Sequence, residues 1–108
     1  MNNIITETKQ NSTGCIAYAM TILGDKWTPF VIKELNECPQ TFSELEKKLI
    51  GISPRTLSQR LNMLKDQSIV SKTLYCEHPP RYSYQLTYKG KDLKDILQDM
   101  ARWSKKYN

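Results

Sequence analysis

The chain has 108 residues, which is enough for one compact domain and too few for two separate hydrophobic cores. Hydrophobic residues make up 39% of it and charged residues 25%, which excludes a chain that is disordered throughout, and the net charge of +5 favours a polyanionic partner. No stretch approaches the ~20 apolar residues of a membrane span and the first residues are too polar for a signal peptide, so we expect a cytoplasmic protein without membrane contact.

A polar segment precedes the first predicted helix. Residues 1–12 show no periodic apolar pattern, so we expect a flexible N-terminal arm followed by a single domain over residues 13–108. Apolar side chains then recur at helical spacing and predict a helix over residues 14–23, which Gly24 would end; they are Ile16, Ala17, Met20 and Leu23.

Capping residues indicate two further helices. Asp25 or Thr28 can cap a second helix with a broad apolar surface, and we expect this helix to be the most buried one. Thr41 and Glu44 then have the spacing of a capping box, in which each side chain satisfies a free backbone amide of the other residue. This motif predicts a third helix that runs to about Leu49.

The fourth predicted helix, over residues 54–67, begins at a strong start signal. Ser53 can accept an amide hydrogen bond as the N-cap, and Pro54 suits the first helical position. A projection at about 100° per residue divides its side chains between two faces, with Leu57, Leu61 and Leu64 on one side and Arg55, Gln59 and Asn62 on the other, flanked by Thr56 and Ser58. One face can pack in a core while the other reads DNA bases.

A hairpin and a long helix complete the chain. The apolar period changes to that of a strand over residues 69–75, and Tyr82, Tyr84 and Leu86 alternate with polar residues in a second strand after a stiff loop over residues 76–80. Thr87 can cap a last helix with apolar residues on one face, namely Leu93, Ile96, Leu97, Met100 and Trp103.

This order of elements is that of a winged helix-turn-helix, a mainly α fold with a small β-hairpin, of the α+β class. The helix over residues 54–67 is the candidate recognition helix, since Arg55 can donate twice to guanine and Gln59 can pair with adenine. We expect further contacts to double-stranded DNA from Thr41, Ser53, Thr56, Ser58, Arg60, Lys65, Lys72 and Arg81. The alternative is that these residues form an ordinary solvated surface and that Lys72 and Arg81 protect an exposed strand.

Five blocks in order along the chain resemble HxlR-type winged helix-turn-helix regulators, which are relatives of the MarR group. They are Leu23-Gly24-Asp25-Lys26-Trp27, Thr41-Phe42-Ser43-Glu44-Leu45, Gly51-Ile52-Ser53-Pro54-Arg55-Thr56-Leu57-Ser58, Pro79-Pro80-Arg81-Tyr82 and Leu86-Thr87-Tyr88-Lys89-Gly90. The resemblance implies a homodimeric bacterial transcription factor that binds an inverted-repeat operator with one recognition helix per half-site. In the family's reading segment the matching residues are Ser53, Arg55, Thr56, Ser58 and Gln59.

The sequence departs from the family pattern at three places. Ser68 stands where a glycine commonly ends the recognition helix, and Cys76 and His78 replace typical residues of the hairpin. Cys15 lies one position later than the cysteine that is frequent near the N-terminus of the family. These departures bear on the end of the recognition helix, on the hairpin and on cysteine sensing.

The last helix carries more apolar surface than so small a core needs to cover. We therefore predict that Leu93, Leu97, Met100 and Trp103, together with Ile16 and Met20 of the first helix, partly face a second subunit. In such a dimer the two recognition helices would lie about 34 Å apart, so that they enter successive major grooves. The alternative is ordinary packing within one chain.

Three cysteines without a paired spacing argue against a disulfide framework. Cys15 is the candidate sensor of oxidants or electrophiles, and the alternative is an inert structural thiol. Cys76 and His78 match no closed zinc site, so we expect neither a metal nor another cofactor, and no small-molecule effector is specified. A single histidine without a nucleophile motif argues against an enzyme, and the alternative to DNA binding is a protein-interaction module.

Overall fold

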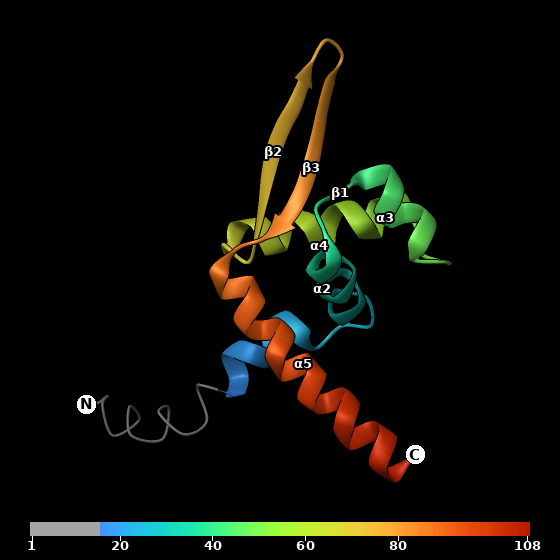
Figure 1. The fold of residues 1–108 in the computed structure, drawn as a ribbon, viewed down its shortest axis with the longest axis vertical. Helices are drawn as coiled ribbons and strands as arrows, with labels where there is room; N and C mark the ends of the chain where they lie inside the picture. The colour runs from blue at the N-terminus through green and yellow to red at the C-terminus, as the bar shows by residue number, and fades with distance from the viewer. Residues whose placement is uncertain (1–15) are drawn as a thin grey trace, which may run out of the picture.

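The computed structural model describes residues 16–108, so the expected arm over residues 1–12 and the candidate sensor Cys15 lie outside the described part of the chain. A helical segment over residues 16–23 comes first and ends before Gly24, as predicted. The labelled elements follow in the order α2 (Thr28–Glu37), β1 (Gln40–Thr41), α3 (Phe42–Lys48), α4 (Pro54–Asp66), β2 (Val70–Glu77), β3 (Pro80–Leu86) and α5 (Tyr88–Tyr107) (Figure 1). This order confirms the predicted α+β class.

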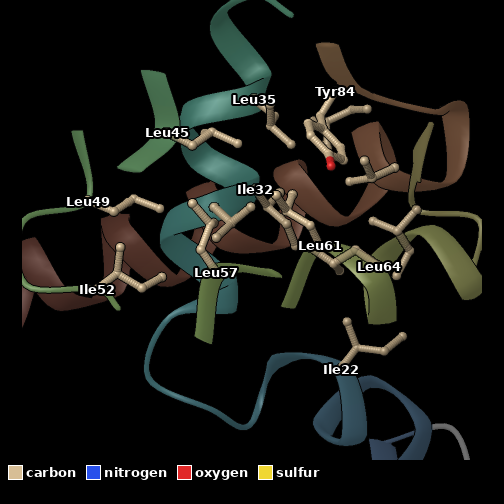
Figure 2. Close-up of a cluster of buried hydrophobic side chains, with 14 residues drawn as sticks. Ile22, Ile32, Leu35, Leu45, Leu49, Ile52, Leu57, Leu61, Leu64 and Tyr84 are labelled. Atoms are coloured by element: carbon tan, nitrogen blue, oxygen red, sulfur yellow. The ribbon is translucent and has the colours of Figure 1, made fainter. Parts of the chain in front are cut away.

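The hydrophobic core lies where α2, α3 and α4 meet the base of the sheet (Figure 2). Val31 and Ile32 of α2 are fully buried, and α4 contributes the leucine stripe that its periodicity predicts. Burying one such aliphatic side chain stabilises the fold by roughly 1.5–3 kcal/mol. The buried members are Ile22, Val31, Ile32, Leu35, Leu45, Leu49, Ile52, Leu57, Leu61, Leu64, Ile69, Val70, Tyr84 and Leu86.

The starts of the helices are held by the predicted capping residues. The N-cap position of α2 is Trp27, whose side chain makes no capping hydrogen bond. Of the two candidates, Asp25 holds this helix start, because its carboxylate accepts the Trp27 and Thr28 N–H groups at 2.8 Å each. Thr28 instead donates its buried hydroxyl to Asp25 at 2.5 Å. Thr41 and Glu44 form the expected capping box of α3.

The sheet has three antiparallel strands in the order β1-β3-β2. The two-residue strand β1 was not predicted, because so short a segment has no alternating pattern. The expected loop over residues 76–80 is also too long: β2 runs to Glu77 and β3 begins at Pro80, which leaves residues 78–79 as the turn. The strands continue because cross-strand pairing resumes between Cys76 and Arg81 after an irregularity that follows Leu74.

The β2–β3 hairpin, here called the wing, projects from the helical body, and the end of α5 extends away from it on another side (Figure 1). Tyr82 is consequently 41% exposed, although its alternation with Tyr84 and Leu86 predicts a buried residue. The pattern correctly assigns these residues to one face of the strand, but only the part of that face next to α2 has a core to pack on. Within residues 16–108, no helix is both long enough and apolar enough to cross a membrane.

Candidate nucleic-acid interface

Helix α4 exposes a polar face opposite its buried leucines. This surface, here called the reading face, consists of Arg55, Ser58, Gln59 and Asn62. Arg55 and Gln59 are four residues apart and therefore lie on the same side of the helix, about 6 Å apart along its axis. A guanidinium and an amide at this separation can reach the edges of neighbouring base pairs in a major groove.

The turn before α4 positions the start of the helix. Gly51 has a φ of +97°, a left-handed conformation that favours glycine, and the next residue, Ile52, is buried. The Ser53 hydroxyl accepts the Thr56 N–H at 3.0 Å and donates to the Thr56 hydroxyl at 2.9 Å. Ser53 and Thr56 therefore hold the helix end that carries Arg55. The amides that remain free at this end favour an anion such as a phosphate.

Arg60, which we expect at a phosphate, has a partner within the chain. Its Nη1 lies 3.5 Å from Asp25 Oδ2, and its side chain is half-buried. Burial raises the pKa of Asp25, but hydrogen bonds from Thr28 and Trp27 and the charge of Arg60 together outweigh burial, so the pKa lies below its ordinary value of 3.8. Arg60 thus fastens α4 to the segment before α2 and is not part of the reading face.

Two other expected contact residues are Lys65 and Thr41. Lys65 is exposed, but it follows Arg55 by ten residues, which is about 15 Å along the helix axis. Thr41 is half-buried, its hydroxyl accepts the Glu44 N–H at 3.2 Å, and its backbone pairs with Ser83. Lys65 therefore lies toward the opposite end of α4 from Arg55, and Thr41 is engaged in the cap of α3 and in the sheet.

The wing carries both of its expected cationic residues on exposed positions. Arg81 lies beside the turn, opposite Cys76 in the strand register. Lys72 pairs across the strands with Tyr84, and its Nζ lies 4.3 Å from the centre of the Tyr82 ring and 5.9 Å from that of Tyr84. The two rings hold the ammonium group by cation–π attraction while leaving it accessible.

Sequence reasoning missed this stacking of Lys72 on the tyrosines. The cross-strand register of the wing was the signal that could have found it, because residues directly opposite in an antiparallel pair share a face. Deriving that register required the correct turn, and the longer loop predicted over residues 76–80 concealed it.

The residues expected at a dimer interface divide into two groups. Ile16, Met20, Met100 and Trp103 are exposed in the described part of the chain. Leu93 and Leu97 are half-buried and pack against the core. The alternative of packing within one chain is therefore correct in part for these two leucines.

A groove of about 490 Å³ runs between α2 and α5. Its apolar lining comes from Pro29 and Phe30 on one side and from Leu97, Met100 and Ala101 on the other. Phe30 and Met100 are each about half exposed. The exposed Met100 of α5 thus borders a hollow that a second protein surface can fill.

Comparison with known proteins identifies what this arrangement resembles. The family profile described as HxlR-like helix-turn-helix matches residues 22–108. The HTH-type transcriptional regulator YvaP of Bacillus subtilis is 37% identical over 86 residues, which cover 80% of this chain and 80% of YvaP. The HTH-type transcriptional regulator YodB of the same organism is 32% identical over 89 residues, covering 82% of this chain and 80% of YodB.

Solved structures agree with the sequence matches. The reduced form of YodB superposes with a TM-score of 0.76 at 31% identity, over 84% of this chain and 89% of the YodB chain. The redox regulator HypR in its oxidised form superposes with a TM-score of 0.79 at 25% identity, over 86% of this chain and 96% of the HypR chain. The described elements therefore have the arrangement of known winged helix regulators.

Proposed function

Because the chain belongs to the HxlR-like helix-turn-helix family and is a transcriptional regulator, we propose that it binds an inverted-repeat operator as a homodimer, with one α4 in each half-site. The observation that carries this proposal is the reading face of α4. Its polar side chains are exposed while the leucines on the opposite side anchor the helix in the core. A helix held in this way can enter a major groove without disturbing the fold.

Each group of candidate contacts has a distinct role in this proposal. Arg55 and Gln59 read base edges, and the exposed Ser58 lies beside them. Lys72 and Arg81 of the wing bind the sugar–phosphate backbone, where contacts set the orientation but carry little sequence information. Lys65 meets a phosphate at the far end of α4. Ser53, Thr56, Thr41 and Arg60 support the interface through the caps and the ion pair described above.

The proposed dimer uses the exposed apolar residues of the first and last helices. Ile16, Met20, Met100 and Trp103 supply surface that the subunit leaves uncovered, and Leu93 and Leu97 continue it into the core. A two-fold axis near α5 would make this surface self-complementary, since the same patch meets itself in a symmetric dimer. Such an arrangement presents two copies of α4 to one side of the duplex.

Selection of duplexes from a randomised DNA library by the purified protein tests the proposal. We expect enrichment of an inverted repeat, binding that weakens steeply with salt, and a loss of about tenfold to a hundredfold in affinity for Arg55→Ala. Arg102→Ala is the matched control, because Arg102 lies on α5 and its side chain is 72% exposed. Weak binding that is indifferent to sequence and to Arg55 would contradict the proposal and favour a protein-interaction module.

A response to oxidants through Cys15 is a second proposal. It is motivated by the solved structures of similar proteins, which include a diamide-treated and a quinone-bound YodB and HypR in oxidised and reduced forms. Diamide removes two electrons and two protons from a pair of thiols and leaves a disulfide, so in this proposal Cys15 is joined to the Cys15 thiol of the second subunit of the proposed dimer.

Three single variants separate the thiols. We expect diamide to change operator binding of the wild type, Cys38→Ser and Cys76→Ser, and to leave Cys15→Ser unchanged. Cys38 is exposed and Cys76 half-buried, both as free thiols. A response that persists in Cys15→Ser and disappears in Cys38→Ser or Cys76→Ser would assign the sensor to the other cysteine.

A further inference from the structure

Three elements meet where the recognition helix ends. Tyr18, in the helical segment 16–23, donates its hydroxyl to Gln67 Oε1 at 2.9 Å. Lys89, in the first turn of α5, donates its ammonium group to the Tyr18 hydroxyl at 2.8 Å and to the Gln67 backbone carbonyl at 2.7 Å. Gln67 is the C-cap of α4. These three side chains, here called the α4 junction, therefore connect both expected dimerisation helices to the recognition helix.

The end of α4 is fixed in a single geometry at this point. Ser68 has a φ of 60°, and hydrogen bonds from Ser68 N to the Lys65 carbonyl and from Ile69 N to the Leu64 carbonyl close the helix as a Schellman motif. The motif occupies the Leu64 and Lys65 carbonyls, and the carbonyl of the C-cap residue Gln67 accepts from a side chain instead.

The first turn of α5 contacts the backbone carbonyls that directly follow α4. The Thr87 hydroxyl donates to the Ser68 carbonyl at 2.6 Å, and a Cβ on Gly90 would overlap the Ile69 carbonyl oxygen. Thr87 and Gly90 set how closely α5 approaches the end of α4. Lys89 and Tyr18 then tie that end to the helical segment 16–23. The end of the recognition helix is consequently held by contacts from both α5 and the helical segment 16–23.

We propose that Tyr18 and Lys89 are positioning residues that set the angle of α4 relative to the dimerisation helices, and thereby the half-site spacing that the dimer accepts. This inference rests on the proposed homodimer. The two copies of α4 are related by the two-fold axis. A tilt of α4 relative to the dimerisation helices therefore occurs in both subunits and changes the separation of the two α4 helices. One base pair of extra spacing moves a half-site by about 3.4 Å and rotates it by about 35°.

The exposure of the α4 junction indicates that it tunes geometry more than it stabilises the fold. Tyr18 is 47% exposed, and water competes for the polar groups of all three residues of the α4 junction. The net stabilisation from one such hydrogen bond corresponds to a factor of about five in an equilibrium constant. That factor is small beside the stability of the core but large enough to discriminate between operators.

The test compares operators that differ only in spacing. The wild-type protein first selects its operator from the randomised duplex library, and duplexes with one base pair added to or removed from the spacer are then prepared. We expect Tyr18→Phe and Lys89→Met to lower the affinity ratio between the selected and the altered duplexes about fivefold. The melting temperature and the dimer dissociation constant should stay close to those of the wild type.

Tyr88→Phe and Lys91→Met are the matched controls, since both residues are exposed in the same turn of α5 and Tyr88 is 88% exposed. Lys89→Arg should restore the spacing preference, because a guanidinium can also donate to two acceptors. An unchanged ratio in Tyr18→Phe, or an equal loss on all duplexes with a lower melting temperature, would overturn the inference alone. If the wild type enriches no sequence, the proposed function fails and the inference fails with it.

Discussion

The two ends of α5 differ in what surrounds them. At the first turn, Gly90 is buried against Ile69, and Thr87 donates its hydroxyl to backbone carbonyls after α4. At the last turns, Trp103 and Tyr107 are each 66% exposed, with their rings 5.4 Å apart. The first end belongs to the core, whereas the second has no cover within residues 16–108. We therefore expect substitutions in the first turn of α5 to change the stability of the fold and substitutions in its last turns to change association of two chains.

The largest effect is expected at the buried end. Gly90→Ala places a methyl group on the Ile69 carbonyl oxygen, and neither backbone can move without disturbing the core. We expect the free energy of unfolding to fall by about 3 kcal/mol or more, at the upper end of the range for overpacking. Urea denaturation measures it, with Ser104→Ala near the other end of α5 as the control. Equal stability of the two variants would show that the two ends do not differ.

Trp103→Ala tests the exposed end. A large aromatic side chain at the centre of an interface typically contributes about 2 kcal/mol or more to association. We therefore expect the dimer dissociation constant to rise at least about thirtyfold, measured by sedimentation equilibrium, while the circular dichroism spectrum keeps its helical signal. Tyr88→Ala, at the opposite end of the same helix, should leave association unchanged. A dimer of unaltered affinity in Trp103→Ala would place the interface elsewhere.

Asp25 is comparable to Thr87, because it also holds the start of a helix from within the fold. Its pKa is lower in the folded chain than its ordinary value of 3.8, so its ionised form stabilises the fold. That contribution is complete above the ordinary value and is lost as the pH falls through the lower, folded value.

Asp25→Asn should remove about 1 kcal/mol of stability at pH 7 and flatten the loss of stability below about pH 4. Urea titrations at pH 7 and at acidic pH measure both effects, with Asp95→Asn on α5 as the control. If Asp25→Asn and the wild type lose stability in parallel on acidification, the carboxylate does not act as described.

The smallest effect concerns Ser68, which ends α4 in a left-handed conformation. Glycine adopts this conformation without the steric cost that a Cβ introduces. We expect Ser68→Gly to raise the free energy of unfolding by about 0.5–1 kcal/mol, visible as a higher melting temperature. Ser71→Gly, in β2, should instead lower it, since glycine weakens a strand. A lower melting temperature for Ser68→Gly would mean that the serine side chain compensates for the strain.

Local patterns in the sequence predicted most elements and their starts. Ser53, Thr41 and Thr87 cap the helices that follow them, because an N-cap depends on residues only three positions away. The division of α4 into a leucine stripe and a polar face was equally predictable from periodicity. The reading face could be named for the same reason.

Contacts between distant segments were not predictable in this way. The short strand β1 exists because Gln40 and Thr41 lie beside β3, and Arg60, expected at a phosphate, instead pairs with Asp25 at 3.5 Å. Tyr82 is exposed because the wing extends beyond the core. For β1 and Arg60 the neighbour lies more than thirty residues away in the chain, and no local pattern reports it.

The sequence by itself determined the helix starts, the reading face and the family, because these depend on the periodicity of apolar side chains and on motifs of a few adjacent residues. Only the tertiary structure decided which polar side chains form hydrogen bonds or ion pairs within the chain and which stay exposed. Hydrogen bonds such as Lys89 to Tyr18 join residues 71 positions apart, and they form only when packing of the core brings their helices together.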